Sequence, residues 1–414
     1  MMEARVEDAT DAARAPVAPT DDVAAQAGDF SLVLGGPLYQ LLRRAHLSDD
    51  ALHLVRQRIV VITLLAWLPL VVLSALGGRL LPGSVPVPFV YDVEVHVRFL
   101  VALPLLILAE LVVHQRMRRI AAAFLDRNLV PPAGRERFMR TLASAMRLRN
   151  SVAAEALLIA LVYVVGVLVV WRHFVVLKTG TWYAFPTGND SSLTAAGIWY
   201  GYVSVPLFQF LLLRWYFRLF IWARFLWQVS RMPLALVPTH PDRLGGLGFL
   251  SNTVYAFAVL VVAHGAILSA QLANRIFFLG ANLLDFKLEM ALMAAFLALL
   301  VFGPLLVFAP QLAECKRIGL REYGTLAERY VRAFDVKWLH ATAPPDEPFV
   351  GSADIQSLAD LGNSYEVVKE MRLAPITRDA IVQLAVALFL PIAPLALTIM
   401  PMEDLLKKLF GLIF

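Results

Sequence analysis

The sequence predicts an all-α polytopic membrane protein: a bundle of about seven transmembrane helices with a small cytoplasmic helical part. Hydrophobic residues make up 59% of the 414 residues and charged residues only 17%, against about 45–50% and about 25% in soluble domains. The apolar residues also gather in blocks of about 20, the helix length that crosses a hydrocarbon layer of about 30 Å. Helix is the simplest backbone that satisfies its own hydrogen bonds there.

Seven blocks meet this length criterion, and several carry a proline in or near the middle. A proline frees a backbone carbonyl, which lipid tolerates only where a second helix, a hydroxyl or a cavity compensates. Such broken helices line many transport routes, although prolines also kink helices for packing. The blocks cover residues 59–77, 98–114, 152–171, 199–221, 253–271, 288–310 and 381–400, and the prolines are Pro69, Pro104, Pro206, Pro304, Pro391 and Pro394.

The N-terminal part divides into a tail and a membrane-associated segment. Residues 1–28 are rich in Ala and Asp and have neither an apolar core nor a basic start. They predict a disordered tail and not a secretory signal. Residues 29–58 contain SLVLGGPLYQLLRRAHL, which predicts cytoplasmic or interfacial helices, lying either in the inner membrane surface or packed on the bundle.

Lysine and arginine counts predict the orientation, because basic loops stay on the cytoplasmic side. With the N-terminus inside, the inner segments hold 27 of the 37 basic residues, many of them in 116–150 and 223–250. This bias predicts a cytoplasmic N-terminus and a periplasmic C-terminus. The net charge of +5 is then explained by arginines that face anionic lipid headgroups, and no nucleic-acid partner is predicted.

Six predicted spans lie within 59–310, and the longest inner segment, 311–378, follows them. Its first half keeps a helical period and continues the sixth span. Beyond TAPPDEP, Ser352 predicts the start of one helix, Gly362 its end, and Asn363 the start of another. We expect a small helical bundle that can dock a cytosolic protein partner. Residues 379–414 predict the seventh span and an amphipathic C-terminal helix on the outer side.

Ionisable residues inside the spans are the strongest functional signal, because each costs at least about 2.5 kcal/mol at a span centre. Arg98 lies near the outer end of the second span, and Glu110 and His114 share one helix face near its inner end. A carboxylate and an imidazole on one face can relay protons. Alternatively, Arg98 reaches the headgroups and Glu110 pairs with inner arginines such as Arg118. Glu155, one turn into the third span, has the same two interpretations.

The fourth span holds Arg214 and Arg218 among twelve aromatic residues between Trp199 and Trp227. Two guanidinium groups one turn apart suit a lipid headgroup, a carboxylate from Glu110 or Glu155, or a permeating anion. They also suit simple anchoring in an aromatic belt at the membrane surface.

His264 lies at the midpoint of the fifth span, with Gln271 seven residues on and therefore on the same face. A lone histidine there is either a packed, hydrogen-bonded group or, if it lines water, a pH-sensitive gate. Both residues are candidates for a transport pathway.

The inner loop VPTHPDRLGGLGF joins the fourth and fifth spans. Its prolines and glycines predict a rigid turn, and its polar residues either tie that turn to the bundle or bind a lipid phosphate. The pattern lacks the spacing of a phosphate-binding loop, and one histidine with one aspartate is too few for a metal site. The candidate residues in this loop are Thr239, His240, Asp242, Arg243, Gly245 and Gly246.

Three runs, VPTHPDRLGGLGFL, GSADIQSLADLGNSYEVVKEMR and VHVRFLVALPLLILAE, resemble a family of uncharacterised multi-pass bacterial inner-membrane proteins. The resemblance covers most of the chain from about residue 30. It implies a bacterial inner membrane and a shared helix bundle. It attaches no activity, so no functional residue is carried over from it.

These patterns favour a channel or transporter for a small ion or solute, because charged and proline-broken spans occur together while no catalytic motif does. A membrane scaffold that docks a cytosolic partner through 311–378 is the first alternative. An interfacial enzyme acting on lipid or an anionic substrate, through His240, Asp242 and Arg243, is the second. No catalytic residue, cofactor or metal site is predicted, and ATP-driven transport would need a separate subunit. A homo-oligomer is left open.

Overall fold

The computed structural model describes residues 30–44, 54–171, 181–187, 190–340 and 351–398. Almost all of its regular structure is helical. Within the described ranges five helices are long and apolar enough to cross a membrane, and a bent helix pair makes a sixth if it is counted as one crossing. The predicted all-α class is therefore confirmed, while the predicted number of seven spans is not. The five helices are Val55–Leu76, Val93–Asp126, Ala195–Val229, Leu247–Leu279 and Leu283–Leu339.

The first two crossings run further than their apolar blocks. Helix α3 covers Val55–Leu76 and contains Pro69. The second consists of α4 (Val93–Val97), a π-helical turn (Arg98–Ala102) and α5 (Leu103–Asp126). Its basic end stays helical because Met117, Ile120 and Phe124 are buried against the bundle, which offsets the polarity of the arginines between them.

The third predicted span begins at a bend. Helix α6 (Arg135–Arg149) meets α7 (Val152–Leu161) at 45°, where the side chain of Ser151 caps α7 by accepting from the backbone of Ala154. A π-helical stretch, Val162–Trp171, continues α7.

The fourth crossing combines α9 (Ala195–Trp199), a second π-helical turn (Tyr200–Ser204) and α10 (Val205–Val229). A short antiparallel hairpin of β1 (Ala184–Thr187) and β2 (Asp190–Leu193) precedes it.

Helix α11 (Thr253–Leu279) is buried along most of its length. Helix α12 (Lys287–Phe302) leads through a 3₁₀ segment (Gly303–Phe308) into α13 (Ala309–Phe334). The 3₁₀ segment lies where Pro304 removes a backbone N–H donor from the helix.

The seventh predicted span corresponds to two short helices. Helix α15 (Arg378–Phe389) has 12 residues, about 18 Å of helix and less than a bilayer needs. A 3₁₀ segment, Ala393–Thr398, follows it after Pro391. Leu395 of that segment packs in an apolar cluster with Leu268 of α11, so the chain does return toward the far end of the bundle. Residues 399–414, with the predicted amphipathic helix, lie outside the described residues.

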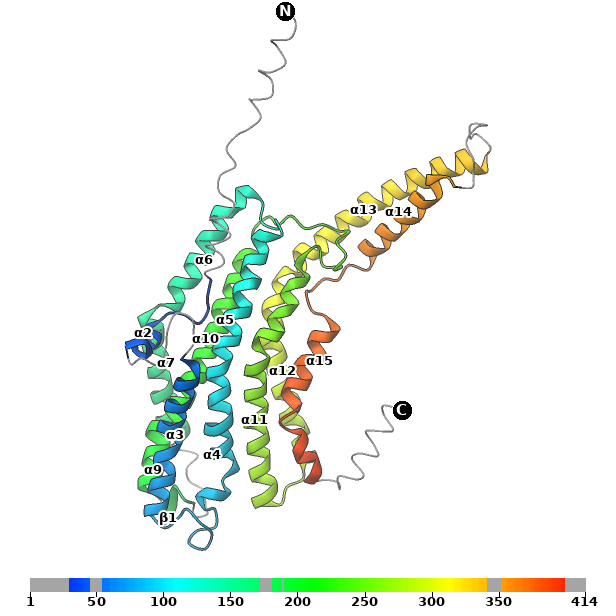
Figure 1. The fold of residues 1–414 in the computed structure, drawn as a ribbon. Coiled ribbons are helices and arrows are strands. Elements are labelled where there is room, and N and C mark those ends of the chain that lie inside the picture. The colour runs from blue at the N-terminus through cyan, green and yellow to red at the C-terminus, as the bar shows by residue number, and fades with distance from the viewer. Residues whose placement is uncertain (1–29, 45–53, 172–180, 188–189, 341–350, 399–414) are drawn as a thin grey trace, which may run out of the picture.

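Figure 1 shows α3, α5, α10, α11 and α12 running side by side as one bundle. The upper end of α6, the connection from α10 to α11, and α13 lie at one end of it, whereas β1 lies at the other. The segments predicted to be cytoplasmic, 116–150, 223–250 and 311–378, thus share one end of the molecule.

The segment 311–378 is largely a hairpin of α13 and α14 (Ala353–Lys369) that projects from the bundle (Figure 1). Ser352 caps α14 as predicted, by accepting from the backbone of Asp354. Gly362 does not end that helix as predicted. Asn363 does not begin a second helix as predicted either, since α14 runs through both residues. Gly362 itself is exposed, and contacts on either side of it, Tyr330 with Asp354 and Gly324 with Tyr365, hold α14 against α13 despite the weak helix propensity of glycine.

The tip of this hairpin should lose stability in acid. Hydrogen bonds from Lys337 and Trp338 to the Asp354 carboxylate lower the pKa of that carboxyl below its ordinary value. The stabilisation is therefore complete above about pH 4, the range of an unpaired aspartate, and is lost as the pH falls through the lower folded pKa. Protection of the amides at the start of α14, measured by hydrogen exchange relative to the intrinsic rate at each pH, should fall below that range. Asp354→Asn should remove this pH dependence of the protection.

Candidate functional site

Glu110 of α5 forms ion pairs with three arginines in the interior of the bundle. Its Oε2 lies 2.5 Å from Nη2 of Arg58 on α3, and its Oε1 lies 2.7 Å from Nη2 of Arg218 on α10. Nη1 of Arg214, one turn before Arg218, is 3.7 Å from the same Oε1. The sequence places Arg214 and Arg218 on one helix face, and the fold turns that face toward Glu110.

Glu155 of α7 is the second carboxylate of this group. Its Oε1 lies 3.2 Å from Nε of Arg214. Its Oε2 accepts a hydrogen bond of 2.7 Å from the backbone of Leu38, at the start of α2 (Pro37–Arg44). A carboxylate there satisfies an otherwise unpaired N–H and interacts favourably with the helix dipole. Glu155 thus links the N-terminal part of the chain to the bundle.

These five residues, Arg58, Glu110, Glu155, Arg214 and Arg218, form what we call the buried charge cluster. All five are at most 6% exposed. Three guanidinium groups face two carboxylates, so the cluster carries one surplus positive charge. Burial makes such a surplus expensive, because the ions have left water and only their partners compensate. Nε of Arg58 is buried without a hydrogen-bond partner.

An N-terminal segment, residues 30–36, covers one side of the cluster. Phe30 stacks on Phe225 of α10 at 5.4 Å, and the backbone carbonyl of Gly35 accepts a hydrogen bond of 3.3 Å from Arg214. Ser31 contacts His114, with Oγ 2.9 Å from Nδ1, and its carbonyl accepts from Arg149. Residues 29–58 were predicted to be cytoplasmic or interfacial helices. Within them α2 and the start of α3 are helical, but 30–36 is non-helical and buried.

Gly36 lets the segment approach the cluster this closely. Its φ is +91°, and a Cβ there would lie 2.9 Å from Oε1 of Glu155. Only glycine adopts this conformation readily and leaves that space empty.

A second group of polar residues, the far polar cluster, lies at the opposite end of the same helices. Arg98 donates to Tyr200 of the neighbouring π-helical turn and pairs with Glu94. Asp92 accepts from Trp182 and from Asn274, both at 2.9 Å. Arg98 is therefore paired within the protein.

An apolar layer separates the two clusters. Arg98 and Glu110 are twelve residues apart on one long helix, about 18 Å along its axis. The buried side chains between them on the second and fourth crossings are mainly apolar and include Ala102, Leu103, Leu106, Phe208 and Leu211. The buried hydroxyl of Ser204 is already engaged, since it donates to the carbonyl of Ala66 at 2.7 Å. Glu110 and His114 also differ in their partners, since one binds arginines and the other contacts Ser31.

His264 belongs to neither cluster. Its Nδ1 lies 2.7 Å from the carbonyl of Leu260, and its Nε2 lies 2.7 Å from the hydroxyl of Tyr216. A carbonyl only accepts, so Nδ1 holds the proton and Nε2 accepts from Tyr216. This is the packed, hydrogen-bonded arrangement. Gln271 is exposed while His264 is 4% exposed, so the two do not form a common site.

The inner loop is organised around Asp242. Its carboxylate accepts from the backbone of Leu244 at 2.8 Å, Gly246 at 3.2 Å and Gly248 at 2.8 Å. Nδ1 of His240 lies 2.9 Å from Oδ1 of the same carboxylate. With its oxygens committed to the turn, Asp242 has the geometry of a structural corner.

The remaining loop residues connect this corner to the hairpin. Arg243, at φ +56°, pairs with Glu370 at 2.6 Å, and the hydroxyl of Thr239 lies 3.5 Å from that of Tyr323. Gly245 and Gly246 have φ of +62° and +99° and lie against Leu236, Met371 and Leu129.

Asp242→Ala is expected to destabilise the protein by about 2–4 kcal/mol, because three backbone donors lose a charged acceptor. Thermal unfolding of the detergent-solubilised protein measures it. His240→Ala is the control, since this side chain is 37% exposed and should cost less than about 1 kcal/mol. Equal effects of the two substitutions would contradict the structural role of Asp242.

Sequence reasoning missed Arg58, Ser31 and Gly36 as members or neighbours of the site. Arg58 precedes an apolar block and was counted as a loop charge. Its position one residue before the first apolar block was the available signal that its side chain could reach into the bundle. Ser31 and Gly36 offered none, because their role depends on contacts with helices at least 83 residues away in the sequence.

Within the described residues no three His, Cys, Asp or Glu side chains gather in a way that could hold a metal ion. No family model, no curated protein and no solved structure matches the chain.

Proposed function

We propose that this protein is a carrier for a small anion in a bacterial inner membrane, with the buried charge cluster as its binding site. The observation that carries the proposal is the surplus guanidinium, three arginines against two carboxylates at most 6% exposed. An anion that enters the cluster neutralises the surplus and accepts the free donor of Arg58. Guanidinium groups bind carboxylate and phosphate oxygens in a fork geometry, so an anion of that kind is the favoured substrate.

The apolar layer favours a carrier over a channel. Its leucine and phenylalanine side chains offer an ion no polar contacts between the two clusters, and conduction needs a continuous polar or hydrated path. In a carrier the N-terminal segment closes the site on one side and the apolar layer closes it on the other. Access alternates when one of these closures opens.

For the membrane topology we propose that the cluster faces the cytoplasm. The end of the bundle where α6 and the α13–α14 hairpin lie contains most of the basic residues, and basic segments stay inside. The proline-broken pair of α15 and the following 3₁₀ segment then makes the seventh crossing, which puts the C-terminus in the periplasm.

Flux into proteoliposomes tests the proposal. The purified full-length protein should take up at least one labelled anion out of chloride, phosphate and small carboxylates, with no ATP present. Arg218→Gln should lower the initial rate about tenfold or more, because it removes a donor to the substrate, whereas Arg147→Gln on the exposed side of α6 should not. Size-exclusion profiles must match for the comparison. If no anion enters above protein-free liposomes, the carrier function is wrong.

The projecting hairpin supports a second candidate function, docking of a cytosolic protein. It exposes Leu326, Val331 and Val336 on α13 and its extension, each at least half exposed, and apolar side chains of this size on a projecting element mark contact surfaces. Leu326→Glu with Val331→Glu should abolish cross-links to a cytosolic partner in cells. The same pair should leave anion flux unchanged, so the two candidates are separable.

A further inference from the structure

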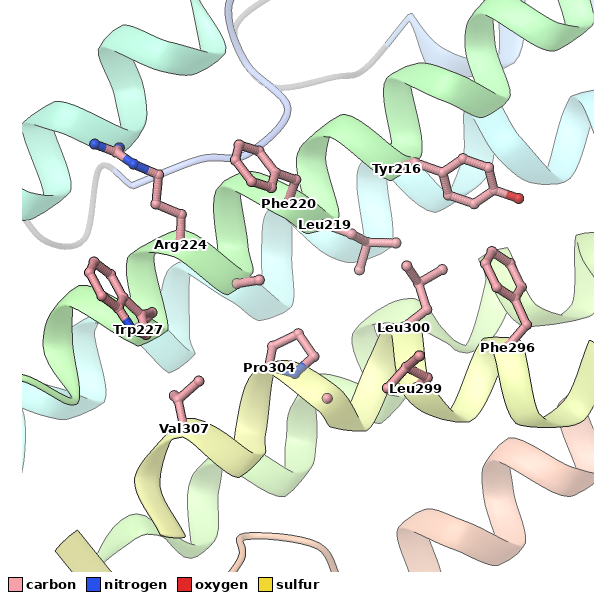
Figure 2. Close-up of a pocket in the computed structure, with 12 residues that line it drawn as sticks. Tyr216, Leu219, Phe220, Arg224, Trp227, Phe296, Leu299, Leu300, Pro304 and Val307 are labelled. Carbon is pink, nitrogen blue, oxygen red and sulfur yellow. The ribbon is translucent and has the colours of Figure 1, made fainter. Parts of the chain in front are cut away.

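A groove runs between α10 and the end of α12, where α12 passes into the 3₁₀ segment Gly303–Phe308. It belongs neither to the charge cluster nor to the hairpin. It encloses about 610 Å³. Its walls include Phe220 and Trp227 of α10, and Figure 2 shows Leu219 of α10 pointing toward Leu300 across the gap. It lies where small or compact residues, Ala223, Gly303 and Pro304, leave the two helices without large side chains to fill the space.

The apolar walls of the groove favour a hydrocarbon chain as its occupant. Its walls are almost entirely apolar, and both helices are among those apolar enough to cross a membrane. Water would find too few polar partners there, and an empty gap forfeits dispersion contacts on both walls. Phe220 and Leu299 are 57% and 70% exposed, so the groove is accessible from the lipid side.

Cationic side chains mark one end of the groove. Arg224 lines the groove, and its guanidinium donates to the hydroxyl of Ser144 on α6 at 3.1 Å. Figure 2 shows this guanidinium at the edge of the groove, pointing away from Leu300 and Pro304. Two turns further on, Arg231 lies over the ring of Trp227 at 5.5 Å. No described carboxylate pairs with either arginine. A tryptophan beside arginines at the end of a membrane helix is the usual arrangement at the headgroup level.

We propose that this groove is a binding site for one anionic phospholipid of the surrounding bilayer. One acyl chain lies between α10 and the 3₁₀ segment, and the phosphate lies near Trp227, Arg224 and Arg231. The apolar walls select the chain, while the two arginines select a negative headgroup. Glu314, further along the same side, does not cancel them because it pairs with Arg317 at 2.6 Å. The site is independent of the proposed transport of an anion.

Native mass spectrometry of the full-length protein tests the headgroup part of the proposal. The protein is incubated with phosphatidylglycerol and phosphatidylcholine of identical chains. The wild type should retain phosphatidylglycerol preferentially, and the pair Arg224→Gln and Arg231→Gln should reduce that preference about tenfold. The matched pair Arg137→Gln and Arg147→Gln changes the net charge equally on exposed positions of α6, and should leave the preference intact. Equal retention of both lipids by the wild type, or equal effects of the two pairs, would overturn the proposal.

Variants in which a larger side chain fills the groove test whether an acyl chain occupies it. Ala223→Phe places a ring in the gap and should abolish retention of both lipids, and Leu300→Trp is a second filling variant if the first is poorly expressed. Retained lipid in a correctly folded filled variant would place the lipid elsewhere and overturn the site. A wild-type dimer that loses its dimeric state on filling would show that a second copy occupies the groove, and this too would overturn it.

Discussion

Glu110→Gln is expected to lower the free energy of unfolding by about 3–5 kcal/mol, the usual cost of leaving buried charges without their partner. The substitution keeps the shape of the side chain but leaves Arg58, Arg214 and Arg218 with Glu155 as the only carboxylate in their cluster. Thermal and denaturant unfolding in detergent measure the effect. Most of the loss should appear as lower expression and a lower melting temperature.

Two further variants make this result interpretable. Adding Arg218→Gln to Glu110→Gln restores the original surplus of one charge and should recover about half of the lost stability, a coupling that a double-mutant cycle quantifies. Glu136→Gln is the exposed control, because its pair with Arg140 is more than 70% exposed on both sides and such pairs contribute at most about 1 kcal/mol. If Glu110→Gln unfolds like the wild type, the cluster does not hold the bundle together.

Gly36→Val is expected to expel the N-terminal segment from the charge cluster. Its φ of +91° is strained for a branched residue, and its Cβ would press on Glu155 at 2.9 Å. Strain of about 1–3 kcal/mol shifts the docked equilibrium by roughly 5- to 150-fold. A cysteine placed at Val33, which is 2% exposed, reports the opening through its rate of maleimide labelling in a Cys315→Ser background.

Gly83→Val is the matched control for this substitution. Its φ is +118°, but a Cβ there meets no atom within 4 Å, so it adds backbone strain without touching the cluster. Labelling of the cysteine should rise in the Gly36 variant alone. Under the carrier proposal, anion flux should rise with it because one closure of the site is weakened. Unchanged labelling would show that the segment is held by other contacts.

Local patterns predicted much of the helical framework and part of the site. Five of the seven apolar blocks lie within helices that meet the span criterion, and the third lies at the bend of a helix pair. Both Glu110 and Arg218 were selected because charges in apolar blocks are expensive, and the alternative of pairing Glu110 with arginines was correct in kind. The sequence suggested Arg118, and separately Arg214 and Arg218, as partners of a buried carboxylate. In the structure Glu110 pairs with Arg214, Arg218 and Arg58, and of these only Arg58 was not suggested.

Other expectations failed where contacts between distant segments decide. Gly362 does not end its helix, because contacts from Gly324 and Tyr330 of α13 hold α14 on either side of it. The segment 30–36 is apolar and contains two glycines, a composition found both at membrane surfaces and in buried loops. Only its contacts with Phe225 and Arg214 show that it is a buried loop. His264 and Gln271 share a helical face but not an environment.

By itself, the sequence determined that this protein is built from helices long and apolar enough to cross a membrane. The cost of exposing a polar backbone to lipid acts on each segment separately, so it can be read from local composition. Only the tertiary structure decided which ionisable groups meet, because partner choice depends on how four helices and one N-terminal segment are placed around Glu110. Charge pairing falls off over a few ångströms, and no local pattern specifies distances of that size between residues a hundred positions apart.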